Sequence, residues 1–227
     1  MNDEVYNMNQ EDIRRCGWCK ADPVYLKYHD EEWGREVRDD KKMFEFLVLE
    51  SAQAGLSWIT ILKRREAYKN AFAGYDAEKV ARMTEKDVEH LMQDSGIIRN
   101  RKKIQATISN AQHFLEVQKE FGSFCRYLKS FLPEGKPIMN HWKSLSEIPA
   151  STPLSDAISK DMKKRGFKFF GTTICYNLFF ALLQRYNSFL FFTNAYKNYW
   201  LILKSPLLGI LSYTLSARIS EKYVLVS

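Results

Sequence analysis

Glu50 is the residue whose place in the sequence most strongly indicates chemistry. A helix through this segment would put Glu50 on the same face as Met43, Phe46 and Leu47, which lie seven, four and three positions before it. Burying a bare carboxylate is costly, so the group must be paired, hydrogen-bonded or protonated. The pattern fits a structural acid bonded to a neighbouring helix end about as well as it fits an acid in a pocket.

Trp58 follows Glu50 closely, and Gly55 stands between them. Gly55 ends one helix before the next begins, which brings the indole and the carboxylate to adjoining helix ends. A nucleobase pocket needs this combination, because an aromatic plane stacks on the base while a polar group bonds to its edge. For Trp58 taken alone, a place in the core is the commoner interpretation.

Cys16, Cys19 and His29 form a second candidate group. Cys-x2-Cys spacing can hold zinc, with a nearby histidine as a third ligand. Two complete ligand pairs would be a strong signal, but no histidine follows His141 and the only later cysteine is Cys175. A free thiol is the favoured interpretation of Cys19.

A third candidate is the segment 94–100, which lies between two helical stripes. Gly96 allows a positive φ, and the backbone N–H groups that follow it at the next helix start can bind a phosphate. The residues expected to contact DNA here are Gly96, Ile97, Arg99, Arg101 and Lys102. On the pattern alone, an ordinary helical hairpin with a solvated basic face is favoured.

Helices must position all of these residues, because the chain shows no run of alternating strands. The apolar periodicity and the capping residues predict one helix over 40–54 after Asp39 or Asp40, a second over 58–73 after Ser57, short helices after Asp76 and Thr84, a long one from Asn100 to Gly122, one from Ser155 to Gly166, and another from about Thr172. We therefore predict an all-α fold.

Composition narrows the class of protein. With 227 residues, 45% hydrophobic and 27% charged, the chain is globular and not disordered. Four cysteines exclude a disulfide scaffold and favour a reducing compartment, and the polar start lacks a secretory signal, so a cytoplasmic location is expected. The net charge is +7, of which residues 177–227 carry +4. DNA binding by the main body would therefore depend on a local patch.

Residues 177–227 differ in kind from the rest. Their aromatic blocks at 178–180 and 189–192 have neither helical nor strand periodicity. Charged residues and Pro206 interrupt each apolar run before about 18 residues, which argues against a membrane span.

Several motifs together resemble the 3-methyladenine DNA glycosylase I family of bacteria, over about residues 14–176. They are Arg15-Cys16-Gly17-Trp18, the run from Tyr28 to Gly34, the run from Leu49 to Ile59, the run from Lys163 to Phe169, and the run from Gly171 to Tyr176. The resemblance implies a helix-hairpin-helix DNA glycosylase fold, with two helical subdomains flanking a base pocket and the hairpin at 95–101.

The resemblance also assigns roles. It makes Glu50 and Tyr28 the residues that bond the methylated adenine and Trp58 the residue that stacks on it, with Trp18 and Trp33 lining or supporting the pocket. It implies excision of 3-methyladenine from alkylated double-stranded DNA by a monofunctional hydrolase, with Glu50 as the catalytic residue, kept ionised by hydrogen bonds. We expect a monomer with no stable protein partner and no membrane association.

The chain departs from that family in one respect. The family completes a zinc site with a Cys and a His near the start and a His-x3-Cys pair near the end. Cys16 and His29 match the first half, and the second half is missing after Tyr176. Zinc binding is therefore expected to be weak or absent.

The predicted organisation is an N-terminal extension over 1–13, a glycosylase domain over 14–176 and an apolar tail over 177–227. A shift of reading frame near codon 177 and a genuinely rewritten C-terminus both account for the tail. Two other classes of function stay open: a DNA-binding helical module that has lost turnover, and a membrane-associated protein suggested by the tail alone.

Overall fold

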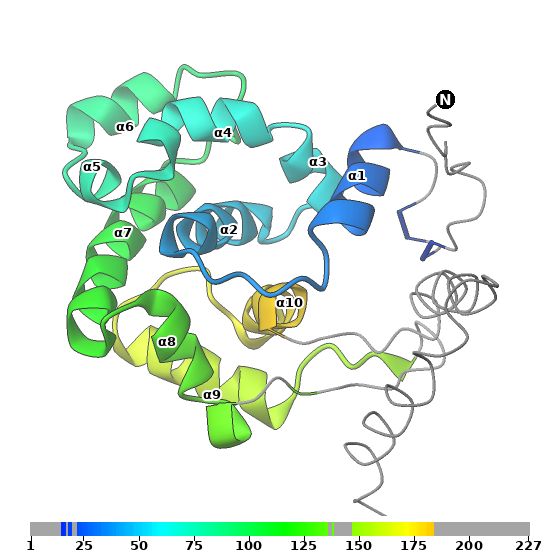
Figure 1. The fold of residues 1–227 in the computed structure, drawn as a ribbon. Helices are drawn as coiled ribbons and strands as arrows, with labels where there is room; N and C mark the ends of the chain where they lie inside the picture. The colour runs from blue at the N-terminus through cyan, green and yellow to red at the C-terminus, as the bar shows by residue number, and fades with distance from the viewer. Residues whose placement is uncertain (1–14, 17, 20–21, 136–137, 139–146, 184–227) are drawn as a thin grey trace, which may run out of the picture. The chain divides into compact units, whose positions relative to one another are not determined.

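The computed structural model describes residues 15–16, 18–19, 22–135, 138 and 147–183. All the regular secondary structure within these residues is helical (Figure 1). The bounds of the helices are α1 Pro23–Glu31, α2 Asp40–Gln53, α3 Trp58–Leu62, α4 Arg65–Ala71, α5 Ala77–Ala81, α6 Glu85–Leu91, α7 Arg101–Phe121, α8 Phe124–Lys129, α9 Pro153–Lys164 and α10 Thr172–Leu183. The predicted all-α class is confirmed. No helix within these residues is long and apolar enough to cross a membrane.

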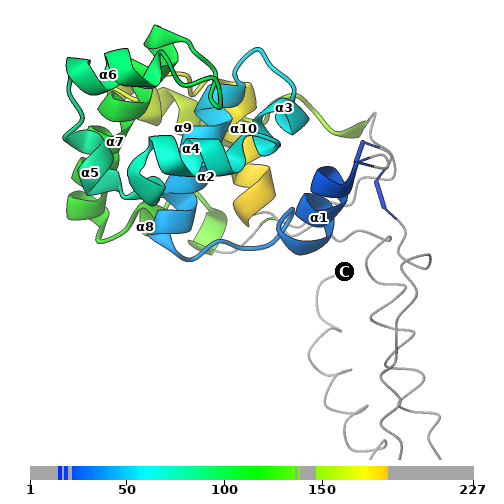
Figure 2. The same cartoon turned by 90° about the horizontal axis from the view of Figure 1, so that it is seen from above.

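Helix α2 forms the centre of the fold. It packs against α3, α4, α7, α8 and α10, and the other helices surround it in Figures 1 and 2. Nine of its fourteen residues are buried, which agrees with the apolar character of most of its sides. Its N-cap is Asp39, whose side chain accepts a hydrogen bond from the Lys42 N–H, as predicted.

The long helix α7 also begins and ends as the sequence predicts. The Asn100 side chain caps its first turn, and Gly122 ends it with a φ of 78°. The short helices α5 and α6 follow Asp76 and Thr84, and Thr84 with Asp87 forms a capping box.

The single helix predicted after Ser57 is wrong. The chain forms α3, breaks at Lys63 and Arg64, and continues as α4. Beyond the break Arg65 pairs with Glu32 and Glu45, which lie on distant parts of the chain. Helical periodicity does not encode these contacts, so the break was not predictable from it.

The cap predicted for α9 is also wrong by three residues. Thr152 is the N-cap and Pro153 is the first helical residue, while Ser155 is the third. The Thr152 N–H donates to the Ser155 hydroxyl at 2.8 Å, and the Ser155 N–H donates to the Thr152 hydroxyl at 3.2 Å. Ser155 therefore completes the cap from within the helix.

Two helices, α1 and α8, were not predicted. Asp22 caps α1 and Pro23 opens it, while Ser123 caps α8. Both helices are under ten residues long, so their apolar pattern is too brief to reveal a period. The predicted domain end at 176 falls inside α10, which runs on to Leu183, and the tail beyond Leu183 lies outside the described residues.

Asp40 joins the start of α2 to the start of α8. Its carboxylate accepts hydrogen bonds from the Phe124 N–H at 2.8 Å, the Cys125 N–H at 3.0 Å and the Gln118 side chain at 2.6 Å. Burial opposes ionisation of Asp40, but these hydrogen bonds outweigh it and lower the pKa of the carboxyl group.

The variant Asp40→Ala should lower the free energy of unfolding by about 1–3 kcal/mol, because it leaves two N–H groups at the start of α8 without their acceptor. Urea denaturation followed by circular dichroism measures this difference. Lys41→Ala is the matched control, since Lys41 is exposed and should change stability by less than about 0.5 kcal/mol. A loss in Asp40→Ala no larger than in the control would contradict the assigned joint.

Candidate active site

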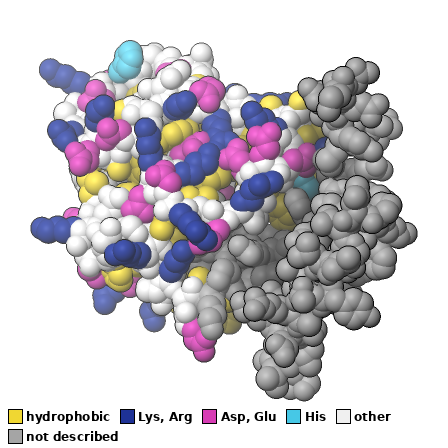
Figure 3. Space-filling view, in the orientation of Figure 1, with side chains coloured by type: hydrophobic (Ala, Val, Ile, Leu, Met, Phe, Trp, Pro, Cys, Tyr) yellow, Lys and Arg dark blue, Asp and Glu magenta, His cyan; other side chains and the backbone are white. Residues whose placement is uncertain are grey.

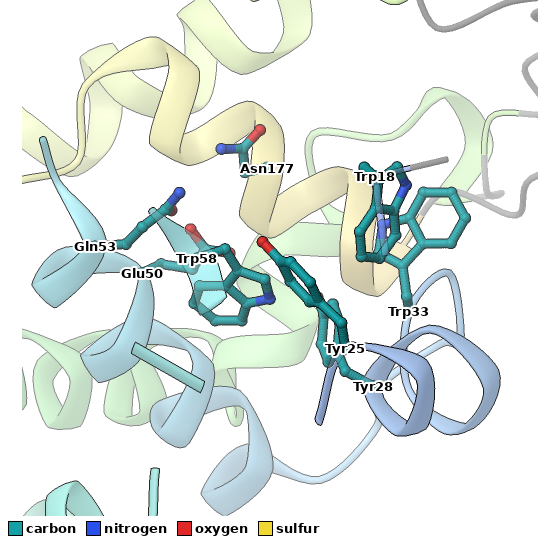
Figure 4. A pocket seen from close by; sticks show the side chains of 8 residues that line it. All are labelled: Trp18, Tyr25, Tyr28, Trp33, Glu50, Gln53, Trp58 and Asn177. Atoms are coloured by element: carbon teal, nitrogen blue, oxygen red, sulfur yellow. The ribbon is translucent and has the colours of Figure 1, made fainter. Parts of the chain in front are cut away.

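A cavity of about 240 Å³ lies between α1, α2, α3 and α10 (Figure 4). Its lining residues are Trp18, Tyr25, Tyr28, Trp33, Glu50, Gln53, Trp58 and Asn177. In Figure 4, Glu50, Gln53 and Trp58 lie on one side and Trp18 and Trp33 on the other, with the two tyrosines between them. The four residues predicted to bind a base, Trp18, Tyr28, Glu50 and Trp58, thus line one cavity.

The Glu50 side chain is buried, with 3% of the residue exposed. Its Oε2 atom has no hydrogen-bond partner in the structure. Burial raises the pKa of Glu50 to about 8. Burial therefore favours the protonated form of Glu50, and no hydrogen bond to its Oε2 atom offsets this, in contrast to the expectation that hydrogen bonds keep the carboxyl group ionised.

Two more buried polar atoms beside the cavity lack a hydrogen-bond partner. They are the Gln53 Oε1 atom and the Trp58 Nε1 atom. Buried polar atoms are nearly always hydrogen-bonded, so each exception requires an explanation. Three such atoms around one cavity indicate a polar ligand that supplies the missing partners.

Aromatic rings form most of the cavity wall. Tyr28 meets Trp58 edge-on, with ring centroids 5.5 Å apart. Trp18 lies 5.3 Å from Tyr25 and 5.4 Å from Trp33, again edge-on. Such faces attract a flat and preferably cationic ring, because the electron density above an aromatic plane is negative.

Two contacts fix the parts of the wall to one another. The Ile59 N–H, next to Trp58, donates to the Tyr25 hydroxyl at 3.2 Å and so ties α3 to α1. Arg65 makes two hydrogen bonds to Glu32, just after α1, at 2.6 and 2.7 Å. The same arginine bonds Glu45 of α2 at 2.5 Å, so one guanidinium joins the three helices α1, α2 and α4.

Lys103, the third residue of α7, holds the end of α2 that carries Glu50. Its ammonium group donates to the Ala52 carbonyl at 2.8 Å and to the Ala54 carbonyl at 2.7 Å. A cation at a helix C-terminus satisfies free carbonyl groups and interacts well with the helix dipole. Burial lowers the pKa of Lys103, because the group gives up water to make these bonds.

Gly96 has a different reason to be glycine than the positive φ expected from the sequence. Its φ does not lie in the left-handed region. A Cβ atom at this position would stand 2.7 Å from the Ala67 Cβ, closer than such atoms approach one another. Gly96 therefore permits close packing of the turn on α4, and the Tyr68 hydroxyl fixes the same turn by accepting the Ile98 N–H at 3.2 Å.

The other residues predicted to contact DNA differ in whether their side chains are free to reach a phosphate. Ile97 is buried, so only its backbone can face a ligand. Arg101 is engaged by Glu85 and Glu89 of α6. Arg99 and Lys102 are exposed, and no acidic residue of the described ranges pairs with them. On the face shown in Figure 3, basic and acidic side chains are interspersed over the coloured residues, which is not the single-sign patch of a DNA-binding surface.

Cys16 and His29, the two zinc ligands that the resemblance implies, are neighbours in the structure. The Cys16 N–H donates to the His29 Nε2 atom at 3.4 Å, and His29 Nδ1 lies 2.9 Å from the Asp30 carboxylate. No group of three or more His, Cys, Asp or Glu residues in the described part of the chain is arranged to hold a metal ion. Because a structural zinc takes four ligands, these residues do not fit such a site.

Three lining residues are not among those expected from the sequence. Gln53 lies three positions after Glu50 on α2, so helical spacing alone would have placed it on the same face. Tyr25 lies three positions before Tyr28, but α1 had not been predicted. Asn177 stands just beyond the predicted domain end at 176, and no signal in the sequence marked it.

Comparison with known proteins gives concordant results. The methyladenine glycosylase family model matches residues 18–182. The DNA-3-methyladenine glycosylase 1 of Escherichia coli is 53% identical over 165 residues, which cover 73% of this chain and 88% of that protein. The DNA-3-methyladenine glycosylase of Haemophilus influenzae is 46% identical over 162 residues, which cover 71% and 87%.

Solved structures give the same result. A crystal structure of a 3-methyladenine DNA glycosylase I matches with a TM-score of 0.73 and 50% identity, over 77% of this chain and 95% of that one. The Staphylococcus aureus enzyme, solved to explain its recognition of 3-methyladenine, matches with a TM-score of 0.72 and 40% identity, over 77% and 92%.

The variant Glu50→Gln should change how stability depends on pH. Glu50 has a raised pKa in the folded protein, so the unfolded chain ionises first, and wild-type stability falls as the pH rises from about 4.3 to about 8. Glutamine does not ionise. The melting temperature of Glu50→Gln minus that of wild type should therefore be higher at pH 8 than at pH 5, by at least about 2 °C. In a domain of this size, each kcal/mol of stability raises the melting temperature by roughly 2–4 °C. Glu66→Gln, which removes an exposed carboxylate, should follow wild type. A constant difference between Glu50→Gln and wild type across this range would contradict the shifted pKa.

Lys103→Met should lower the free energy of unfolding by about 1–3 kcal/mol, because the Ala52 and Ala54 carbonyls lose their donor while the aliphatic packing is largely kept. Urea denaturation measures the loss. Lys102→Met, at the exposed neighbouring position, is the control and should lie within about 0.5 kcal/mol of wild type. Equal stability of the two variants would show that Lys103 does not hold the end of α2.

Proposed function

The chain belongs to the methyladenine glycosylase family, and we propose on that premise that it removes 3-methyladenine from alkylated DNA by hydrolysing the N-glycosidic bond. Two relatives carry the name DNA-3-methyladenine glycosylase, and a related structure at 39% identity holds 3-methyladenine itself. The enzyme would be a monofunctional hydrolase acting in base-excision repair.

The observation that carries this proposal is the buried Glu50 carboxyl group, which faces an aromatic cavity with one oxygen lacking a partner. A 3-methyladenine base in DNA is cationic. Its positive charge would lower the pKa of Glu50 on entry, so that the carboxyl group releases its proton to water and pairs with the base. Neutral adenine offers no such charge and gains less from the aromatic walls.

Hydrolysis needs little further help from the protein, because the cationic base is a good leaving group. The bond between the sugar C1′ atom and the base nitrogen breaks, and its electron pair neutralises the base. A water oxygen then bonds to C1′, and the proton that this water loses goes to solvent. We propose that ionised Glu50 stabilises the base and the oxocarbenium-like sugar as charge moves from one to the other. Extrusion of the base from the DNA helix would bring it into the cavity, where it stacks on Trp58 within reach of Glu50 and Tyr28.

We further propose that the turn between α6 and α7 is the helix-hairpin-helix element that anchors double-stranded DNA. Its backbone is fixed by the contacts of Gly96 and Ile98, and Arg99 and Lys102 are available to phosphates. Arg101 would instead brace the hairpin through its pairs with α6. The protein would act as a monomer, and a DNA substrate agrees with the cytoplasmic location expected from the sequence.

A DNA-binding module without turnover is the alternative, and the pocket does not favour it. The residues expected to bond and stack on the base all line one cavity. The incomplete set of zinc ligands at Cys16 and His29 would affect the stability of the fold and not the catalytic pocket. We propose that zinc binds there weakly or not at all. None of the chemistry described above depends on a metal.

Glu50→Gln should release 3-methyladenine from alkylated DNA about 10- to 150-fold more slowly than wild type, because it loses a charge-assisted contact to the cationic base worth about 1.5–3 kcal/mol. Chromatography of the free base released from methylated duplex measures the rate. Glu66→Gln, with an exposed carboxylate removed, should keep the wild-type rate. If Glu50→Gln were within about twofold of wild type, a change of under roughly 0.5 kcal/mol, the role of Glu50 would be wrong.

A further inference from the structure

Phe169 is exposed in an unusual backbone conformation. It lies in the loop between α9 and α10, with 37% of the residue exposed and a φ of 63°. A bulky aromatic residue rarely adopts a positive φ, and such strain persists only where the surrounding structure imposes it. The loop thus displays an aromatic ring to solvent at a cost in conformational energy.

The surrounding structure does fix this loop. The buried Asn110 side chain of α7 bonds both backbone groups of Lys168, donating to its carbonyl at 3.0 Å and accepting its N–H at 2.8 Å. The Ser159 hydroxyl donates to the Phe170 carbonyl at 2.8 Å. Phe167 and Phe170 are buried on either side. The exposed position of Phe169 is therefore built into the fold.

The charge around Phe169 is positive. Lys163, Lys164 and Lys168 are exposed, and no acidic side chain in the described part of the chain pairs with them. Arg165 differs, because Asp161 and Glu120 neutralise it. Residues 162–171 include no acidic residue. An exposed aromatic ring among unpaired lysines suits a nucleic acid, which offers phosphates to the lysines and apolar sugar and base surfaces to the ring.

Helix α7 places this loop in register with the turn after α2. Asn110 lies seven residues after Lys103, which is two helical turns, so both side chains project from one face of α7 about 10 Å apart. Lys103 holds the turn after α2, in which Leu56 is an exposed hydrophobic residue. Asn110 holds the loop in which Phe169 is exposed. Figure 2 shows the end of α2 and the start of α10 along the same edge of the helical body.

We propose that the loop 166–171 is a second DNA-contacting element, in which Phe169 packs on the sugar and base surface of the duplex near the lesion and Lys168 contacts a phosphate. This inference rests on the proposed function in that it takes damaged duplex DNA as the partner. The loop would contribute to the affinity for duplex DNA and not to recognition of the base inside the pocket.

Phe169→Asn tests the aromatic contact without disturbing the loop, because asparagine tolerates a positive φ better than phenylalanine. The probe is a DNA duplex carrying a tetrahydrofuran abasic site, with Kd measured by fluorescence anisotropy. Phe169→Asn should bind it about tenfold more weakly, a change of about 1.4 kcal/mol. Phe169→Tyr should restore most of the affinity. The affinity for free 3-methyladenine should stay at the wild-type value in both variants.

Lys168→Gln tests the phosphate contact. The slope of log K against log salt should fall by about 0.9 for one lost phosphate contact. Lys41→Gln is the matched control, since it removes an exposed charge at the opposite end of α2 and should leave the slope unchanged.

Duplex affinity of Phe169→Asn within twofold of wild type, or an equal loss for the free base, would overturn the proposal. If Phe169→Asn failed to fold, Phe169→Gly would repeat the test, because glycine adopts this backbone without strain. Release of 3-methyladenine by the wild-type protein tests the proposed function separately. A wild-type chain that binds the duplex through Phe169 but releases no base would disprove the function and leave the contact standing.

Discussion

Burial of the Glu50 carboxyl group with one oxygen lacking a partner is the constraint on which the rest of the structure depends. A buried polar group left unsatisfied costs about 1–3 kcal/mol, more if it is charged, and the surrounding helices would relax to remove the cost if they were free to move. They are not free, because α2 is held at its start by Asp40 and near its end by Lys103. The pocket therefore stays open and its acid stays unpaired until a ligand completes it.

Helix α7 gives the molecule a common frame. Its first turn follows the hairpin proposed to hold phosphates, its third residue fixes the end of α2, and its tenth fixes the loop that carries Phe169. A rigid helix fixes the spacing between these points. DNA held at the hairpin would thus lie at a fixed distance from Glu50. This fixed geometry favours extrusion of a base into the pocket.

Much of this arrangement could be predicted from the sequence, and the reasons for success and failure are physical. Helices α2 and α7 carry strong apolar patterns between clear caps, so their bounds follow from local chemistry. Glu50 and Trp58 could be paired because only the short segment 54–57, which includes Gly55, separates their helices. The break before Arg65 depends on partners far away in the chain. The raised pKa of Glu50 comes from burial, which only the assembled fold produces. Gly96 was identified as important for the wrong reason, since only the fold shows how close Ala67 approaches.

The aromatic wall of the cavity has an optical consequence. Trp18, Trp33 and Trp58 are three of the five tryptophans in the chain, and all three line the site. Indole emission depends on the polarity around the ring and on nearby electron acceptors, and a cationic purine entering the cavity changes both. The chain thus carries intrinsic fluorophores at the place where its ligand enters. Occupancy of the cavity can therefore be followed by tryptophan fluorescence, without any attached label.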